Sequence, residues 1–241
     1  MNIITWNCNG AFRNKLHTLE EYHHDILVIQ ECEDPSKSTK AYKEWATNYL
    51  WIGKSKNKGI GVFCKNDISL KQLDWSDINT NYKNEQLESF LPCLINDDII
   101  LLAVWTKRAN SEVFGYIGQL WKYLKLHKYK LKDKKVMIIG DFNSNVIWDK
   151  WDRWWNHSDV VNELEEIGII SLYHHLYNEE QGNESQPTFY LQRKLEKSYH
   201  IDYIFISSNL IKNKSKLEVG EVNNWLEYSD HMPLFLELSY I

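Results

Sequence analysis

Seven short apolar runs, separated by longer polar segments, restrict the fold of this chain more than any other feature. The runs are rich in Ile, Val, Leu and aromatic side chains, as strands buried within a sheet are. They cover residues 2–6, 26–30, 59–64, 99–105, 136–140, 201–207 and 234–238. We therefore predict seven buried β-strands that are joined by the polar segments.

Three of the intervening segments are predicted helices, at residues 14–24, 111–127 and 158–167. In the first two, side chains at helical spacing form a stripe. They are Leu16, Leu19 and His23 in the first segment, and Val113, Ile117, Leu120 and Leu124 in the second. The third begins with Ser158 as a candidate N-cap and stops before Gly168, which fits the position after a helix end.

Strands and helices alternate at first, and several later strands are hairpin-like. This order favours an α/β protein with a mixed sheet or two stacked sheets flanked by helices over a purely parallel barrel. The chain has 241 residues, 43% of them hydrophobic, with only four prolines and ten glycines. These numbers indicate one domain, residues 1–241, with a sizeable core and little room for a disordered linker.

The formal net charge of −5 argues against a protein that coats polyanions, since such proteins are usually basic. It is compatible with an enzyme that acts on phosphate esters. A bound divalent metal cancels local carboxylate charge, and a local basic rim can still attract a polyanionic substrate.

The four cysteines, Cys8, Cys32, Cys64 and Cys93, form no CxxC pair and lie in or beside apolar runs. This favours the reduced thiols of a cytosolic protein over a disulfide framework or a zinc site. The first residues lack the basic and apolar regions of a signal peptide, and no stretch approaches the ~20 apolar residues that span a bilayer. We expect a soluble cytoplasmic protein with no membrane association.

Polar side chains stand at the ends of several predicted strands. They are Asn7 after the first strand, Glu31 after the second, Asp141 and Asn143 after the fifth, and Asp230 and His231 before the last. In a mixed sheet, the end of one strand and the start of an antiparallel neighbour lie at the same edge. We therefore predict that these groups converge on one cleft.

These residue types suit phosphoester chemistry. Glu31 and Asp230 offer the hard oxygen ligands that Mg²⁺ or Mn²⁺ prefers, and the sequence has no HExxH motif or Cys/His cluster for zinc. An aspartate can deprotonate water, while a metal and an imidazolium neutralise developing charge. No Ser, Cys or Lys has an obvious activating partner, so we predict water as the nucleophile. Each motif alone also fits a plain turn, and only their joint occurrence favours the chemical interpretation.

Taken together, five pieces of the sequence resemble the endonuclease/exonuclease/phosphatase superfamily. They are WNCNG at 6–10, QE at 30–31, GDFN at 140–143, HIDYIF at 200–205 and SDHMP at 229–233. The pieces span almost the whole chain and are specific as a set. The resemblance implies a four-layered α/β sandwich, in which two central mixed β-sheets are flanked by helices. It also implies a Mg²⁺- or Mn²⁺-dependent attack of water on a phosphate ester.

The resemblance implies a metal site in the cleft. Glu31 would bind the metal, Asp230 would contribute to the site, and Asn7 would line its pocket. The metal would be Mg²⁺ or Mn²⁺, in keeping with these oxygen ligands.

The resemblance also implies the catalytic roles. Asp141 would position the attacking water, and Asn143 would hold the scissile phosphate. Asp202 would hydrogen-bond His231, which would contact the phosphate. An Asp–His pair of this kind keeps the imidazole in one tautomer and favours its charged form.

Two aromatic stretches, PTFY at 187–190 and YHIDY at 199–203, are similar to the exonuclease III and abasic-site endonuclease branch. Phe189, Tyr199 and Ile201 match positions that form a sugar-binding pocket in that branch. His200 stands where the branch usually has Arg or Lys, and the Cys-Asp-Arg signature of inositol phosphatases is absent. The resemblance therefore implies a nucleic-acid substrate, with DNA favoured over RNA.

The strand at 99–105 departs from the repair enzymes, because VWTKR stands where many of them carry Tyr-Pro-Asn or a histidine. Trp105 either stacks on the substrate or donates its indole N–H, or it packs at the edge of the core. Lys107 and Arg108 either clamp phosphate oxygens or belong to a solvated loop.

The sequence WDKWDRWW, from Trp148 to Trp155, has two interpretations. If it is helical, Trp148, Trp151 and Trp155 share one face. That face either packs on the domain or, with the intervening Lys and Arg, forms a platform for stacking bases. Asp149 and Asp152 weaken the second interpretation, because their charges repel phosphate.

The leading hypothesis is a nuclease that hydrolyses nucleic-acid phosphodiesters with Mg²⁺ or Mn²⁺. The alternative is a phosphatase or phosphodiesterase that acts on a small-molecule or lipid phosphate with the same catalytic core. A non-catalytic binding module of the same fold is disfavoured, because every acidic position of the motif set is present.

Overall fold

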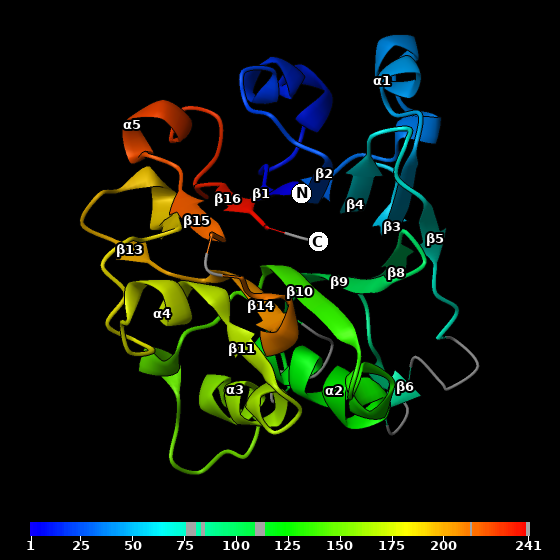
Figure 1. Cartoon of the computed structure of the whole chain (residues 1–241). Coiled ribbons are helices and arrows are strands. Elements are labelled where there is room, and N and C mark those ends of the chain that lie inside the picture. Colours follow the sequence, from blue (N-terminus) through cyan, green and yellow to red (C-terminus); the bar gives the residue numbers. More distant parts are fainter. Residues whose placement is uncertain (76–80, 83–84, 109–113, 213, 240–241) are drawn as a thin grey trace.

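The chain forms two six-stranded β-sheets that pack face to face in the computed structural model (Figure 1). The structure describes residues 1–75, 81–82, 85–108, 114–212 and 214–239. Each sheet has one parallel pair of strands at its centre and antiparallel pairs on both sides. Both sheets are therefore mixed, as predicted.

The first sheet joins the two ends of the chain, and the second is built from its middle. The first has the order β15 (Lys216–Val219), β16 (Leu234–Glu237), β1 (Asn2–Asn7), β2 (Ile26–Cys32), β4 (Lys58–Cys64) and β3 (Tyr49–Ser55). The second has the order β11 (Ile169–Ser171), β14 (Asp202–Ser207), β10 (Lys135–Asp141), β9 (Ile99–Trp105), β8 (Phe90–Ile95) and β5 (Leu70–Gln72). Two short hairpins pair β6 (Asn81–Tyr82) with β7 (Glu85–Gln86), and β12 (Phe189–Tyr190) with β13 (Ser198–Tyr199). Each of the seven predicted runs coincides with a strand of the two large sheets.

Three clusters of buried apolar side chains separate four layers. The first cluster fills the space between the sheets, with side chains such as Val28 and Ile139. The second packs α2 (Ile117–Leu131) and α3 (His157–Glu165) on the outer face of the second sheet (Figure 1). The third covers the outer face of the first sheet with these elements: α1 (Lys40–Trp45), α5 (Val222–Trp225) and the 3₁₀ helices η1 (Phe12–Asn14) and η2 (Leu16–Leu19). The predicted four-layered sandwich is thus confirmed.

Shorter elements lie at the rim of the sandwich. The helix α4 (Leu172–Tyr177) contacts β14 and β15 and so spans the side of the two sheets. The remaining 3₁₀ helices are η3 (Pro35–Lys37), η4 (Val146–Trp148), η5 (Leu191–Arg193) and η6 (Ser208–Leu210).

The predicted helix at residues 14–24 is wrong. The segment instead continues from η1 into η2, and its backbone bonds run from i to i+3. Lys15 lies between them with φ −117° and ψ 4°, outside the α-helical region, and its ammonium donates to the carbonyls of Cys8 and Tyr228. These long-range contacts fix Lys15 in a turn, which periodicity along the sequence does not reveal.

The other two predicted helices form with different ends. The helix predicted at 111–127 is α2, which starts at Ile117, and residues 111–113 lie outside the described residues. The helix α3 is capped by Asn156 rather than Ser158, because Asn156 and Asp159 form a reciprocal capping box. Gly168 follows with φ +74°, as expected for the residue after a helix. Among the described helices, none has the length and apolar surface that crossing a bilayer requires.

The segment from Trp148 to Trp155 is not a helix, so the condition for Trp148, Trp151 and Trp155 to share one face is not met. After η4 the chain makes turns, and Trp155 is buried whereas Trp151 is 98% exposed, so the two rings do not share a face. The cause is the start of α3, where the Asp149 carboxylate accepts hydrogen bonds from the N–H groups of His157 and Ser158 over 2.8 and 3.1 Å. This contact folds the segment back on the next helix.

All four cysteines are free thiols, in agreement with the prediction. Burial raises the pKa of Cys8 and of Cys64 to about 12. A thiol with such a pKa is protonated at neutral pH and is a poor nucleophile. The buried thiols are therefore poor candidates for the nucleophile, and water remains the expected one.

Candidate active site

The predicted catalytic residues meet at one edge of the sandwich, where a strand from each sheet ends. β1 ends at Asn7 and β10 ends at Asp141, and Asn7 Nδ2 donates to Asp141 Oδ2 over 2.9 Å. Asp202, the first residue of β14, lies opposite Asp141 in the sheet register. His231 Nε2 lies 4.0 Å from Asp141 Oδ2. Asp141, Asp202 and His231 thus form a buried group whose ligand atoms all lie within 4.8 Å of one another.

Asp141 is fully buried and is held by the turn that follows it. The backbone N–H of Asn143 donates to Asp141 Oδ1 and its Nδ2 donates to Oδ2, each over 2.7 Å. Asn143 adopts φ +45° and also donates to the carbonyl of Thr106 over 3.0 Å. Gly140 has φ +141°, and a Cβ there would stand 2.0 Å from the carbonyl oxygen of Val104. The GDFN motif therefore needs its glycine for close strand packing and its asparagine for holding the aspartate.

Asp202 orients His231. His231 Nδ1 lies 2.9 Å from Asp202 Oδ2, so Nδ1 carries the proton and Nε2 faces Asp141. Thr188 Oγ1 donates to the same carboxylate over 2.8 Å and accepts from the N–H groups of Ile201 and Asp202, each over 3.0 Å. The Asp202 carboxylate therefore holds the imidazole, and Thr188 holds the carboxylate.

Backbone contacts join the SDH motif to the first strand. Ser229 Oγ donates to the carbonyl of Asn7 over 2.7 Å and accepts from the N–H of His231 over 3.0 Å. Trp6 Nε1 donates to the carbonyl of His231 over 2.9 Å. Sequence reasoning missed both Ser229 and Thr188. Each lies inside a motif, SDHMP or PTFY, but nothing in the sequence says that its hydroxyl points at the site.

The electrostatics of the group favour an ionised imidazole beside a basic carboxylate. Burial raises the pKa of Asp141 to about 7, against the opposing effect of His231. For His231, burial disfavours the charged ring, but Asp202 and Asp141 outweigh it and raise the pKa to about 9. A carboxylate that takes up a proton near neutrality and a cationic imidazole are the two groups that an attack of water on phosphate needs.

The predicted metal ligands lie beside this group. Glu31 has φ +62° at a β-bulge, where the register between β2 and β4 shifts, and its carboxylate forms an ion pair with Lys58. Asp230 is half-buried, and its charge contributes to the raised pKa of His231. Asn7 Oδ1 accepts from the N–H of Asn9 over 3.0 Å. The donors are all hard oxygens, and Lys58 already supplies a positive charge at Glu31, so the residues fit a divalent cation.

Two of the predicted substrate-binding residues form an aromatic series with the imidazole of His231. Phe189 pairs with His231 in an isolated bridge, and their ring centroids lie 4.6 Å apart. Phe189 faces Tyr199 across the β12–β13 hairpin, with 6.5 Å between ring centroids. Tyr199 in turn lies 5.0 Å from the ring of Trp148. The sequence motif predicts Phe189 and Tyr199 at the site, and the structure adds Trp148 to the series.

The other predicted substrate-binding residues occupy the end of β9. Trp105 is 8% exposed and belongs to the core between the sheets, which favours the packing interpretation of this side chain. The ammonium of Lys107 lies over its ring at 4.6 Å and 4.0 Å from Glu88. Arg108 is exposed and lines a cavity that also contains Asn143. Of these three residues, Arg108 is the one that lines a cavity together with Asn143.

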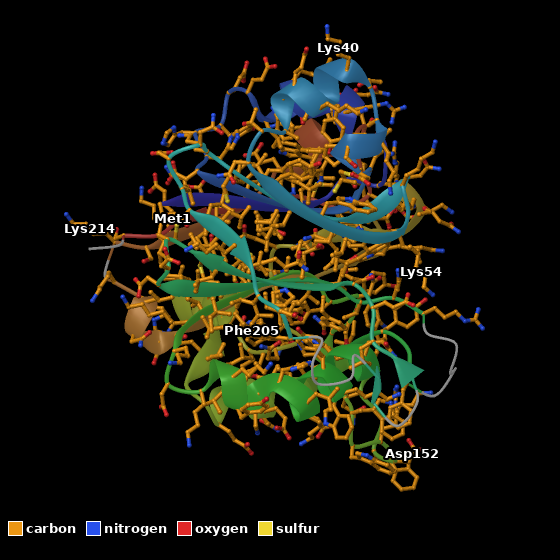
Figure 2. The ribbon with its side chains drawn as sticks, turned by 90° about the vertical axis from the view of Figure 1, so that its right-hand side faces the viewer. Met1, Lys40, Lys54, Asp152, Phe205 and Lys214 are labelled. Atoms are coloured by element: carbon orange, nitrogen blue, oxygen red, sulfur yellow. The ribbon has the colours of Figure 1, made fainter. Side chains whose placement is uncertain are left out.

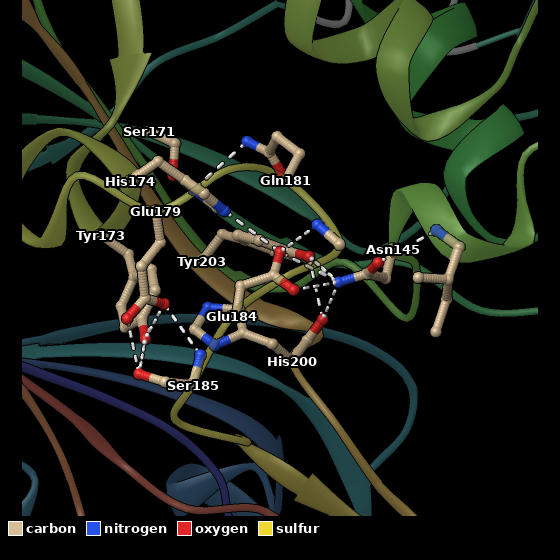
Figure 3. Close-up of polar contacts among 12 residues, drawn as sticks. Asn145, Ser171, Tyr173, His174, Glu179, Gln181, Glu184, Ser185, His200 and Tyr203 are labelled. Atoms are coloured by element: carbon tan, nitrogen blue, oxygen red, sulfur yellow. Dashed lines mark hydrogen bonds and ion pairs between the residues drawn. The ribbon is translucent and has the colours of Figure 1, made fainter.

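A second buried polar cluster, shown in Figure 3, includes Asn145, which follows the turn that holds Asp141. It consists of Asn145, His174, Glu184, His200 and Tyr203, and we call it the closed cluster. Glu184 accepts from Asn145 Nδ2 and His174 Nε2, each over 3.1 Å. The Tyr203 hydroxyl donates to the carbonyl of His200 over 2.9 Å. Since Asn145 follows Asn143 by two residues, this cluster anchors the turn that holds Asp141. Neither His174 nor Glu184 lies in a motif that points to this cluster.

Known proteins of the same fold share this arrangement of strands. A 3′ phosphatase, NExo, from Neisseria bound to a product DNA hairpin has a TM-score of 0.69 and 18% identity, over 100% of both chains. An AP endonuclease from Archaeoglobus fulgidus has a TM-score of 0.66 and 18% identity, also over 100% of both chains. The catalytic domain of Xenopus laevis APE2 has a TM-score of 0.66 and 15% identity, over 99% of this chain and 91% of that one.

The family assignment comes from the sequence rather than from the fold. No curated protein matches the chain. The profile of the Endonuclease/Exonuclease/phosphatase family, however, matches residues 4–231. Because this match covers almost the whole chain, the protein belongs to the Endonuclease/Exonuclease/phosphatase family and is an enzyme of that hydrolytic class, as predicted.

Proposed function

We propose that the protein is a nuclease that hydrolyses nucleic-acid phosphodiesters, DNA in preference to RNA, with a bound Mg²⁺ or Mn²⁺. The observation that carries this proposal is the buried, face-to-face placement of Asp141 and His231, whose Oδ2 and Nε2 atoms lie 4.0 Å apart. This distance is too long for a direct hydrogen bond but lets one oxygen atom contact both groups. An oxygen there meets a base on one side and a cation on the other.

Asp141 takes the part of the general base. It accepts a proton from water while the water oxygen attacks phosphorus and the bond from phosphorus to the leaving sugar oxygen breaks. Its pKa, raised by burial to about 7, makes the carboxylate a better proton acceptor than an exposed aspartate. The hydrogen bonds from Asn7 and Asn143 keep it in place during the transfer.

His231 and Asn143 hold the phosphate. The cationic imidazole faces the reacting oxygen through Nε2, because Asp202 occupies Nδ1. Asn143 Nδ2 donates to Asp141 and to the carbonyl of Thr106 in this structure, so it would exchange one of these bonds for a phosphoryl oxygen. Donors fixed in this way stabilise the charge that develops on the phosphoryl oxygens in the transition state.

Glu31 would hold the divalent ion, with Asp230 and Asn7 contributing oxygen atoms. When bound, the ion would supply positive charge against the phosphoryl oxygens. Lys58 now pairs with Glu31 and is exposed, so its side chain is free to swing away when a cation binds.

Two observations favour a nucleic-acid substrate. The rings of Phe189 and Tyr199 continue from His231, where they can pack against a sugar. Structures of the same fold include a 3′ phosphatase bound to a DNA hairpin and an AP endonuclease. The fold alone does not transfer their substrates, so the aromatic series is the stronger argument.

The test is a panel of labelled oligonucleotides incubated with Mg²⁺, Mn²⁺ or EDTA. The panel contains single-stranded and duplex DNA, an abasic duplex, DNA with a 3′ phosphate, and RNA. We expect cleavage of DNA that requires the metal and that weakens steeply with salt, as binding to a polyanion does. Glu31→Gln should raise the Mg²⁺ concentration needed for half-maximal rate, whereas Asp98→Asn, at the opposite end of its sheet, should not.

The same panel contains the outcomes that reject the proposal. Hydrolysis of bis(p-nitrophenyl) phosphate without cleavage of any oligonucleotide would point to a phosphatase or phosphodiesterase for a small-molecule or lipid phosphate. Release of inorganic phosphate from the 3′-phosphorylated DNA alone would restrict the activity to terminal phosphates. Cleavage that persists in EDTA would reject the role of the metal.

A further inference from the structure

The segment from Trp148 to Trp155 exposes indole rings beside the active site, and the proposed reaction does not use them. Trp148 is 43% exposed, Trp151 98% and Trp154 63%. Asp152, in the middle of the segment, projects from the same side of the molecule as Lys54 and away from Met1 (Figure 2). Since large exposed aromatic surfaces are rare on soluble proteins, a gathering of this kind marks a binding surface.

The segment is held in a fixed shape although its rings are exposed. Asn156 Oδ1 accepts from the N–H of Lys150 and its Nδ2 donates to the carbonyl of Lys150, each over 3.0 Å. Arg153 Nη2 donates to the carbonyl of Trp148, also over 3.0 Å. Trp155 anchors the end of the segment, with its ring centroid 4.2 Å from that of Phe114. A surface that is already ordered loses little conformational entropy when it binds a ligand.

The sequence places acidic residues in this segment, but the structure reduces the effect of one of them on a polyanion. The carboxylate of Asp149 accepts from two backbone N–H groups at the start of α3, so its charge is compensated by the helix. Arg153 Nε is buried and has no hydrogen-bond partner within the described part of the chain. Arg108, Arg153 and Asp149 line the same cavity, and because the Asp149 carboxylate is bonded to α3, the two arginines give this cavity its positive character.

This cavity extends from Trp148 to Asn143, in the turn that holds Asp141. It has a volume of about 600 Å³, and Tyr116, Asn143, Ser144 and Trp148 contribute to its walls. Trp148 also ends the aromatic series that starts at His231 and passes through Phe189 and Tyr199. Trp148 therefore connects the groups that would hold the scissile phosphate to a segment whose next two indoles, Trp151 and Trp154, are exposed.

We propose that the segment 148–155 binds unpaired nucleotides of the substrate strand, with Trp151 and Trp154 stacking on bases and Arg108 and Arg153 contacting the backbone. Single-stranded nucleic acid, or an unpaired end next to a duplex, is then the preferred substrate class. The reason is that only unpaired bases offer both faces to an indole, whereas bases in a duplex stack on each other. This inference rests on the proposed nuclease function.

The test measures binding without cleavage, in the Asp141→Asn background with Mg²⁺. A fluorescein-labelled oligothymidylate and the same strand in a blunt duplex are titrated with protein, and anisotropy gives each Kd. Changing both Trp151 and Trp154 to Ala should weaken binding of the single strand at least about tenfold, since each lost stack costs a similar factor. Binding of the blunt duplex should change by less than about twofold. Because both rings are exposed, the variant should keep its fold.

A matched control is Tyr129→Ala, which removes a ring on α2 that is 63% exposed and lies outside the segment. It should leave both Kd values unchanged. If the double variant binds the single strand as tightly as its parent, or loses duplex binding equally, the inference is overturned while the nuclease proposal stands. If the wild-type protein cleaves no oligonucleotide and the Asp141→Asn protein binds none, both are overturned, and the exposed tryptophans belong to a protein–protein surface.

Discussion

The molecule contains two buried carboxylate–imidazole pairs that have similar geometry and different surroundings. At the candidate active site, His231 Nδ1 lies 2.9 Å from Asp202, and among the described residues no hydrogen-bond acceptor is recorded for its Nε2, which lies 4.0 Å from Asp141. In the closed cluster, His174 Nε2 lies 3.1 Å from Glu184, and its Nδ1 lies 2.6 Å from Ser171 Oγ. One ring keeps a nitrogen for a ligand, whereas the other uses both nitrogens within the protein.

The histidine rings of the two regions also differ in charge. Burial would lower the pKa of His231, but two carboxylates outweigh it and raise the pKa to about 9, so the ring is cationic. Burial lowers the pKa of His200, and lowers that of the neighbouring His157 to about 4, so these rings are neutral. Carboxylates act on all three rings, but they outweigh the effect of burial only at His231, where Asp202 lies within hydrogen-bond distance.

The largest loss of activity is expected for a change of Asp141, the carboxylate that has no counterpart in the closed cluster. Asp141→Asn removes the proton acceptor while keeping the size of the side chain, and the rate of phosphodiester cleavage should fall by about 10³-fold or more. Single-turnover cleavage of a labelled oligonucleotide measures the loss. Circular dichroism and urea unfolding show whether the fold is kept. A rate within tenfold of the wild type would mean that another group deprotonates the water.

A smaller loss is expected from the orienting partner of the imidazole. Asp202→Asn leaves His231 next to an amide, which neither fixes the Nδ1–H tautomer nor favours the cation. We expect a fall in kcat of about 100-fold with little change in KM, because the loss is felt in the transition state. Thr188→Val, which removes the hydroxyl that donates to the Asp202 carboxylate, should give a weaker effect in the same direction. A change confined to KM would instead assign Asp202 to substrate binding.

The closed cluster should affect stability more than rate. Burial opposes the charge of Glu184, but hydrogen bonds from His174, the Gly182 N–H and Asn145 outweigh it and lower the pKa to about 2. Glu184→Gln should therefore reduce the free energy of unfolding by about 1–3 kcal/mol at pH 7. The rate should fall less than about tenfold, through a looser catalytic turn. Glu180→Gln, a neighbouring exposed change, should alter neither, and a loss of rate as large as that of Asp202→Asn would make the closed cluster part of the reaction.

The two regions also differ in how far the sequence predicts them. Asn7, Asp141 and His231 each stand at a strand boundary inside a motif, and strand boundaries at one sheet edge must lie close together. The apolar runs therefore predict both the sheets and the convergence of these residues. The position of Glu31 and Asp230 outside the group of Asp141, Asp202 and His231 keeps their metal role a prediction.

What the sequence does not reveal depends on contacts between distant side chains. Lys15 leaves the helical path because it binds the carbonyls of Cys8 and Tyr228, which no local pattern encodes. The closed cluster joins Asn145 to Glu184, far apart in the chain and in no motif. The exposure of Trp151 follows from the side chain of Asp149, which bonds to α3 instead of continuing a helix. Periodicity describes a segment alone, and these features arise where segments meet.

The smallest effect on rate is expected from His157→Phe. This variant also tests directly whether a buried histidine outside the active site is neutral, in contrast to His231. His157 is fully buried against Tyr203, and the side chain of Gln181 is a polar neighbour of its ring, so Phe should fit with the loss of at most that contact. The folded-state pKa of about 4 lies below the ordinary value of 6.5. Between these values the unfolded chain binds more protons, so the stabilisation is complete above pH 6.5 and falls by up to about 3 kcal/mol as the pH drops to 4. Urea unfolding at several pH values should show that Phe removes this slope, while the exposed control His175→Phe keeps it; equal slopes in all three proteins would mean that His157 titrates normally when folded.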